Sequence, residues 1–117
     1  MARSTPAQNP LGFANKTLVF DEVDAGIGGE AAQSIGDALA ALGRHHQVLV
    51  VTHLAQVAAA ADTHVSVSKK IENGATFATA QHLPVNERVD EIARMLSGSA
   101  THSAREHARE LLAESPL

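Results

Sequence analysis

The amino-acid sequence predicts an α/β fold in which mostly parallel strands are flanked by helices. Residues 17–22 form an apolar run that ends in two carboxylates, and residues 47–53 form a second apolar run that ends in a histidine. Between these runs, apolar residues recur at the spacing of a helix. The order strand, helix, strand predicts a βαβ unit with two parallel strands.

The segment between the two strands starts with a glycine-rich loop, residues 24–29. A helix is expected from Glu30, with its apolar positions at Ala31, Ile35, Ala38, Leu39 and Leu42. Gly43 stands where the C′ residue of a helix belongs. The second strand, residues 48–52, is a continuous apolar run, which is typical of a strand covered on both faces.

After the second strand, the sequence predicts a short helix and a β-hairpin. Residues 54–61 are rich in alanine and predict the helix. Residues 63–70 and 75–83 flank a Glu-Asn-Gly turn, which is typical of two antiparallel strands joined by a tight connection.

Two closing helices complete the expected fold. The first should begin at Asn86, a good N-cap residue, and end at Gly98. The second should run from about residue 101 to 114. Their apolar stripes are expected at Val89, Ile92, Ala93 and Leu96, and at Ala104, Ala108, Leu111 and Leu112.

The composition indicates one small domain or a part of one. The chain has 117 residues, of which we expect 1–16 to be an irregular leader and 17–117 to form one lobe. A core built largely from alanine buries little area at this length, which favours a partner surface.

Charge and cysteine content exclude several classes of protein. The net charge is −4 and no basic run exceeds Lys69-Lys70, which is unlike a nucleic-acid-binding surface. The absence of cysteine excludes disulfides and thiolate metal sites. No signal peptide and no apolar run of roughly 20 residues is visible, so we expect a cytoplasmic protein without a membrane partner.

Asp21, Glu22 and His53 are expected to converge, because the carboxyl ends of parallel strands lie at one edge of a sheet. In phosphate chemistry, one acid at such an edge holds Mg²⁺, usually through water. A second acid orients or deprotonates the attacking water, and a histidine can contact the γ-phosphate. An apolar strand followed by two acids also arises by chance, so the alternative of a strand end without chemistry stays open.

Longer strings of residues carry a family resemblance. Thr-Leu-Val-Phe-Asp-Glu-Val-Asp-Ala-Gly-Ile-Gly-Gly covers residues 17–29, and Val-Val-Thr-His-Leu-Ala-Gln-Val-Ala covers residues 50–58. Together with Glu-Ile-Ala-Arg-Met-Leu at 91–96 and His-Ala-Arg-Glu-Leu-Leu at 107–112, they resemble the RecN family. RecN proteins are bacterial ATPases of DNA double-strand-break repair and are related to the SMC proteins. The resemblance covers roughly residues 16–114.

The resemblance implies a role for each residue at the sheet edge. Asp21 would be the Walker B acid on the magnesium side, Glu22 the catalytic carboxylate, and His53 the histidine of the switch loop, or H-loop. The D-loop, which lies against the partner head at the dimer interface, would contain Asp24, Gly26, Gly28 and Gly29. Related SMC heads usually have an aspartate where this chain has Gly28, and the glycine is shared with the RecN pattern.

The same resemblance implies the carboxyl-terminal lobe of an ABC- or SMC-type ATPase head that serves DNA repair and recombination. ATP and Mg²⁺ would bind the complete head. This chain alone is expected to bind them weakly and not to hydrolyse ATP, because it contains no Walker A string, Gly-x-x-x-x-Gly-Lys-Ser/Thr, and no signature motif. The implied partners are an amino-terminal lobe, a second head in a homodimer, and DNA contacted through a nucleoid-associated full-length protein. The alternative is a non-catalytic interaction module that docks on a partner head.

Other candidate sites are weaker. His45 and His46 are adjacent in a predicted turn, where side chains diverge rather than share a metal. His102 and His107 are five positions apart, which does not align two ligands on a helix face. Gln56 is expected to face either the site or an adjoining head, or else to be an ordinary exposed helix residue.

Overall fold

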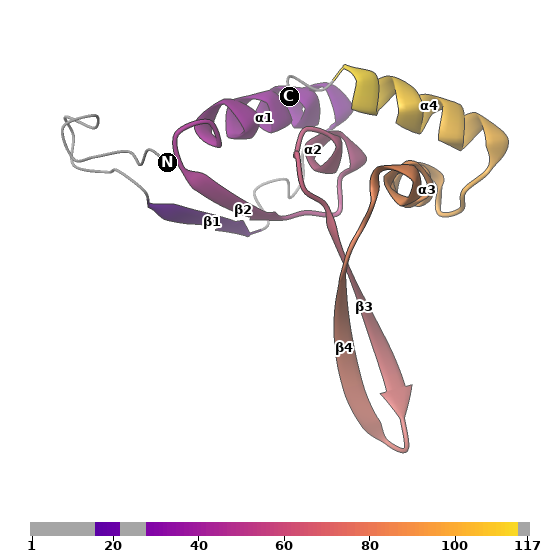
Figure 1. Ribbon diagram of the computed structural model, residues 1–117. Coiled ribbons are helices and arrows are strands. Elements are labelled where there is room, and N and C mark those ends of the chain that lie inside the picture. The colour runs from indigo at the N-terminus through magenta and orange to yellow at the C-terminus, as the bar shows by residue number, and fades with distance from the viewer. Residues whose placement is uncertain (1–15, 22–27, 115–117) are drawn as a thin grey trace.

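The computed structural model describes residues 16–21 and 28–114, and in this part of the chain it confirms the α/β class (Figure 1). The elements are β1 (Thr17–Asp21), α1 (Gly29–Leu42), β2 (Gln47–Val51), α2 (Ala55–Ala59), β3 (Val65–Glu72), β4 (Ala75–His82), α3 (Val85–Ser97) and α4 (His102–Ala113). Every boundary lies within two residues of its expected position. The expected leader lies almost entirely outside the described residues.

Strands β1 and β2 form a two-stranded parallel sheet, as the βαβ pattern predicts. Leu18 pairs with Val48, and both side chains are half-buried. Along each strand, half-buried residues alternate with exposed ones. The expectation that β2 is covered on both faces is wrong for the described chain. Side chains alternate across a sheet, and only the face on the side of α1 in Figure 1 is covered. The open face exposes Val19, Leu49 and Val51, at 66%, 50% and 59% of their surface.

Helix α1 buries a stripe one position away from the expected one. Its buried residues are Ala32, Gly36 and Ala40, which are spaced by four, whereas Ala31 and Ala38 are exposed. Ile35, Leu39 and Leu42 are half-buried, as expected of the side that faces the sheet. The stripe is shifted because α1 packs most closely against α2, and only small side chains fit there.

The helix ends also differ in detail from the sequence prediction. The N-cap of α3 is Pro84 and not Asn86, because the Pro84 carbonyl already accepts hydrogen bonds from the amides of Glu87 and Arg88 at 3.0 Å. Gly43 ends α1 in the right-handed region, with φ −65°, and so does not use the freedom of glycine. Gly98, in contrast, ends α3 in the left-handed region, with φ 85°.

The main core lies where α2, α3 and α4 meet. Ile92, Ala93 and Ala108 are fully buried there. The buried cluster is completed by Ala55, Ala58, Ala59, Ala104 and Leu111. The stripes predicted for α3 and α4 are thus confirmed, and they pack mostly through alanine, which lets the helix axes approach closely.

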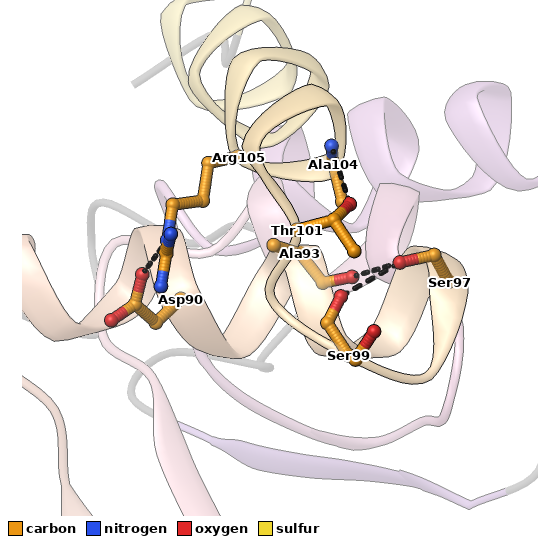
Figure 2. Close-up of polar contacts among 7 residues, drawn as sticks. All are labelled: Asp90, Ala93, Ser97, Ser99, Thr101, Ala104 and Arg105. Carbon is orange, nitrogen blue, oxygen red and sulfur yellow. Dashed lines mark hydrogen bonds and ion pairs between the residues drawn. The ribbon is translucent and has the colours of Figure 1, made fainter.

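One polar contact links α3 directly to α4, and others order the turn between them (Figure 2). Arg105 Nε donates to Asp90 Oδ1 at 2.8 Å. Ser97 Oγ contacts the carbonyl oxygens of Ala93 and Ser99 at 3.3 and 2.7 Å. The amide of Ala104 donates to Thr101 Oγ1 at 3.2 Å, which caps α4.

Strands β3 and β4 form an antiparallel hairpin that projects away from the helices in Figure 1. Asn73 and Gly74 join them with φ values of 51° and 80°, the left-handed pair of a type I′ turn. Nearly every hairpin residue is exposed, including Val67 and Ile71. The hairpin therefore keeps its shape through its own ladder and turn rather than through burial.

Within the described residues, no helix combines the length and the apolar character needed to cross a membrane.

Candidate functional site

The parallel register of β1 and β2 brings the candidate sheet edge together. Asp21, the last residue of β1, pairs with Val51, the last residue of β2. His53 follows Val51 by two residues, so it lies at the edge where Asp21 ends its strand. Both side chains are exposed there. Glu22, Asp24 and Gly26 lie outside the described residues, and their expected roles stay predictions.

A tight turn presents His53 between β2 and α2. The hydroxyl oxygen of Thr52 accepts a hydrogen bond from the amide of Leu54 at 3.0 Å. Leu54 is the N-cap of α2, and its carbonyl accepts the Ala58 amide at 3.1 Å. The turn is therefore continuous with the helix, so the orientation of α2 sets the position of His53. Residues 52–54 are called the His53 turn below.

Gly28 and Gly29, the described end of the expected D-loop, lie at the start of α1. Gly28 is the N-cap, and its carbonyl accepts the Ala32 amide at 2.9 Å. A Cβ added at Gly29 would lie 3.5 Å from Nε2 of Gln56. Gln56 is half-buried, and its amide thus lies against the start of α1. The amino-terminal ends of α1 and α2 are neighbours, which the sequence alone did not establish.

A close approach at Gly36 fixes α1 to α2. A Cβ at this position would lie 3.1 Å from the Gln56 carbonyl oxygen, 3.2 Å from Ala60 Cβ and 3.4 Å from Val57 Cα. The separations from the Gln56 oxygen and from Ala60 Cβ are tighter than ordinary van der Waals contact, so an alanine here would require its neighbours to shift by a few tenths of an ångström. A glycine inside a predicted helix was the available sequence signal, because glycine is otherwise unfavourable there.

Arg88 holds the other end of α2, and no pattern in the sequence marked it as a functional residue. Its Nη2 atom donates to the carbonyl oxygens of Ala58 and Ala61, at 3.1 and 2.9 Å. Burial lowers the pKa of the guanidinium, and the negative charge of Asp62 partly opposes this shift. Arginine remains charged in proteins, so Arg88 brings a positive charge to the carboxyl-terminal end of α2.

His64 lies beside Arg88 and has only 9% of its surface exposed. Burial lowers the pKa of the imidazole, and the charge of Arg88 lowers it further, whereas Glu91 acts in the opposite direction. His64 Nδ1 is buried without a hydrogen-bond partner in the described part of the chain. The neutral imidazole is thus favoured in the folded state.

Glu91 and Arg94 form an ion pair on α3. Arg94 Nε donates to Glu91 Oε1 at 2.8 Å, and the second guanidinium nitrogen contacts the other carboxylate oxygen. This bond and the charge of Arg94 lower the pKa of Glu91 despite its partial burial, and the same bond raises the pKa of Arg94. An open pocket beside this pair is lined by Leu83, by α3 and by the turn that follows it, with no residue from β1, β2 or the His53 turn.

The weaker histidine candidates gain no support as metal ligands. His45 and His46 lie in the connection between α1 and β2. His102 pairs with Glu106 at 2.6 Å, and His107 is exposed on α4. Among residues 16–21 and 28–114, no three histidine or acidic side chains gather as a metal site would require.

Comparison with known proteins places the fold. No protein-family model matches the chain. The chain superimposes with a TM-score of 0.55 on an SMC ATPase from a structural study of ATP-driven dimerization and DNA-stimulated activation. The match covers 69% of this chain and 48% of that one, at 18% sequence identity. The likeness therefore concerns the fold alone.

Sequence relatives are much closer. The chain is 54% identical over 103 residues to the DNA repair protein RecN of Deinococcus radiodurans. It is 51% identical to RecN of Treponema pallidum and 54% identical to RecN of Mycobacterium tuberculosis, over 98 and 100 residues. These matches cover 82–88% of this chain but only 17–18% of each relative.

The chain thus has the fold of part of an SMC ATPase structure. Within that class, the chain belongs to the RecN family and corresponds to a segment of those longer proteins. The expected family and fold class are thereby confirmed.

Proposed function

We propose that the chain supplies the Walker B, D-loop and H-loop part of an ATPase head that acts in DNA double-strand-break repair and recombination. The observation that carries this proposal is the parallel register that pairs Asp21 with Val51, two residues before His53. It is supported by identity above 50% to DNA repair proteins named RecN.

Each residue at the edge has a distinct chemical task in this proposal. The carboxylate of Asp21, exposed at the end of β1, suits Mg²⁺ held through water, because this ion prefers oxygen ligands and keeps part of its hydration shell. Glu22 orients the attacking water and accepts its proton. His53 donates a hydrogen bond to the γ-phosphate as negative charge shifts during transfer. Bound Mg²⁺ neutralises phosphate charge.

Residues on the amino-terminal side of α1 are assigned to the head interface. The D-loop, with Asp24, Gly26, Gly28 and Gly29, contacts a second head when ATP closes a homodimer. The phosphate cradle and the signature motif come from the remaining lobe of the head, and DNA is bound by other parts of the longer protein. These partners are proposed because the chain spans under a fifth of the length of its relatives.

A second candidate function is a non-catalytic docking module. The open face of the β1–β2 sheet favours it, since Val19, Leu49 and Val51 form an exposed apolar row that a partner would cover. The two functions differ in whether the edge residues matter for turnover.

The deciding experiment restores the rest of the head. The 117-residue chain is mixed with a polypeptide that contains the remaining head sequence of the Deinococcus radiodurans relative, and phosphate release is measured with Mg²⁺ and ATP. We expect no turnover by either part alone and turnover by the mixture. Glu22→Gln should lower the rate by at least roughly 10²-fold while ATP binding persists, because the general base is lost.

The matched control is Glu110→Gln on the exposed side of α4, which removes an equal charge away from the sheet edge and the D-loop and should leave the rate unchanged. Association of the two polypeptides with no turnover would favour the docking module. Equal turnover by Glu22→Gln and the parent would remove this strand end from the catalytic machinery.

A further inference from the structure

Helix α2 cannot hold its own position. It has five residues, Ala55–Ala59, whereas isolated helices shorter than about 12 residues are marginal in water. Its N-cap, Leu54, makes no side-chain capping bond to the helix. The position of α2 therefore depends on tertiary contacts, and the His53 turn is joined directly to its first residue.

Two of these contacts come from different helices, α1 and α3. Gly36 packs against the flank of α2 through the close separations described above. Arg88 reaches from the first turn of α3 to the carbonyl oxygens of Ala58 and Ala61. The Ala58 oxygen, which also accepts the Ala61 amide at 3.2 Å, lies in α2, and the Ala61 oxygen lies just past its carboxyl-terminal end, where a positive charge is favourable.

We propose that Arg88 is a positioning residue that sets the place of His53 by fixing α2 from its far end. The proposal rests on the role assigned to His53 under "Proposed function". The hydrogen bonds of Arg88 go to the carbonyl oxygens of Ala58 and Ala61 and not to the described residues of the sheet edge. Its effect passes along one turn of helix, from Ala58 through the hydrogen bond of the Ala58 amide to Leu54, and then to Thr52.

The hydrogen bonds of Arg88 indicate which side chains could replace it. A single nitrogen, Nη2, makes both hydrogen bonds, while Nε is buried without a partner in the described part of the chain. The forked shape of arginine is thus not used. A lysine ammonium, which has three donors on one nitrogen, should replace it in part, whereas the neutral amide of glutamine should not.

The test uses the 117-residue chain and follows amide hydrogen exchange by NMR. In Arg88→Gln we expect exchange of the Leu54 and Ala58 amides to rise about tenfold relative to Ala108 in α4, because hydrogen bonds to a charged group are lost. Global destabilisation would speed all these amides alike, so the ratio isolates the effect on α2. Arg88→Lys should recover at least half of the change on a logarithmic scale.

The matched control is Arg105→Gln, which removes the hydrogen bond to Asp90 between α3 and α4 shown in Figure 2. It should leave the Leu54 to Ala108 ratio unchanged. An Arg88→Gln variant with a parental ratio, or a lysine variant as fast as glutamine, would overturn the proposal.

Failure of this inference and failure of the proposed function give different results. In the restored head, Arg88→Gln should reduce turnover no further than His53→Ala, and in the His53→Ala background it should add little. Suppose that the His53 turn stays ordered in Arg88→Gln while His53→Ala abolishes turnover. This pair of results refutes only the role of Arg88. Suppose instead that Arg88→Gln loosens the turn but His53→Ala leaves the turnover of the restored head unchanged. The positioning effect of Arg88 then stands, and the role of His53 is refuted.

Discussion

The buried histidine His64 should make the stability of the chain depend on pH. Its imidazole lies next to the Arg88 charge, and its pKa is lowered first by burial and then by that charge. In the unfolded chain the pKa returns to its ordinary value near 6.5. Below that pH the unfolded state therefore binds more protons than the folded state, and acid favours unfolding.

The free energy of unfolding should consequently keep its full value, as far as His64 is concerned, above about pH 6.5. It should decline as the pH falls from there toward the lower pKa of His64 in the folded state. We expect His64→Gln to flatten this decline, and urea titrations between pH 5.5 and 7.5 would measure it. The control is His107→Gln on the exposed face of α4. Glu91, whose pKa is also lowered, loses its contribution only below its ordinary value of 4.5, so its loss lies below the titrated range of pH 5.5 to 7.5. Parallel pH profiles for parent and His64→Gln would contradict the assignment.

At the level of single residues, the sequence predicts the sheet edge better than the helix junction. Asp21 and His53 could be placed because each follows an apolar strand, and parallel strand ends share an edge. Arg88 and His64 could not, because their environment depends on how closely α2 and α3 approach. The shift of the N-cap from Asn86 to Pro84 has a similar cause, since backbone carbonyls compete with side-chain propensity.

At the scale of elements, the contact between α1 and α2 decides which helical stripe is buried. Gly36 would count against a helix by propensity alone, yet it is buried in α1 and lies close to α2. Periodicity in the sequence weighted the larger apolar residues and therefore missed the alanine and glycine stripe. Small residues carry little hydrophobic signal even where they are completely buried.

Gly36→Ala should destabilise the chain by about 1–2 kcal/mol, as overpacking of a tight contact does. At an unconstrained helix position the same change would stabilise by about 0.5–1 kcal/mol, so the sign of the effect is diagnostic. Ser34→Ala, on the exposed side of α1, is the control and should be neutral or slightly stabilising. Thermal or urea unfolding measures both, and a stabilised Gly36→Ala variant would show that α2 yields easily.

The hairpin offers a second test at this scale. Gly74 adopts φ 80°, a conformation that costs an L-residue about 1–2 kcal/mol. Gly74→Ala should therefore loosen the β3–β4 ladder, with faster amide exchange in both strands and little change in α3 and α4. Asn73→Gly is the matched control, because glycine accepts the φ of 51° found there. Equal exchange in the two variants would mean that the ladder, and not the turn, fixes the hairpin.

At the scale of the whole molecule, the described chain contains two separate two-stranded sheets. The Glu-Asn-Gly turn and the two apolar runs were enough to predict both. The sequence could not show that one face of the β1–β2 sheet stays open, because a continuous apolar run looks the same whether the covering element lies within this segment or elsewhere. The chain itself matches only 17–18% of the length of its relatives.

We expect the isolated chain to self-associate through this face and through the unpaired strand edges beside it. Sedimentation velocity across micromolar concentrations should show species larger than the monomer in the parent. Leu49→Lys places a charge in the middle of the apolar row and should shift the distribution toward monomer. Ser34→Lys adds the same charge on α1 and should not. If the parent stays monomeric at all these concentrations, the open face does not mediate self-association.

The alanine-built junction around α2 has a consequence for conformational entropy. Alanine has no side-chain rotamers to lose, so residues 58–60 join several helices without the penalty of immobilising long side chains. The same residues bury few apolar atoms and return little hydrophobic free energy each. Evolutionary change at this junction should therefore be limited by side-chain volume. Only glycine is smaller than alanine, and a larger side chain would displace α2, to which the His53 turn is joined.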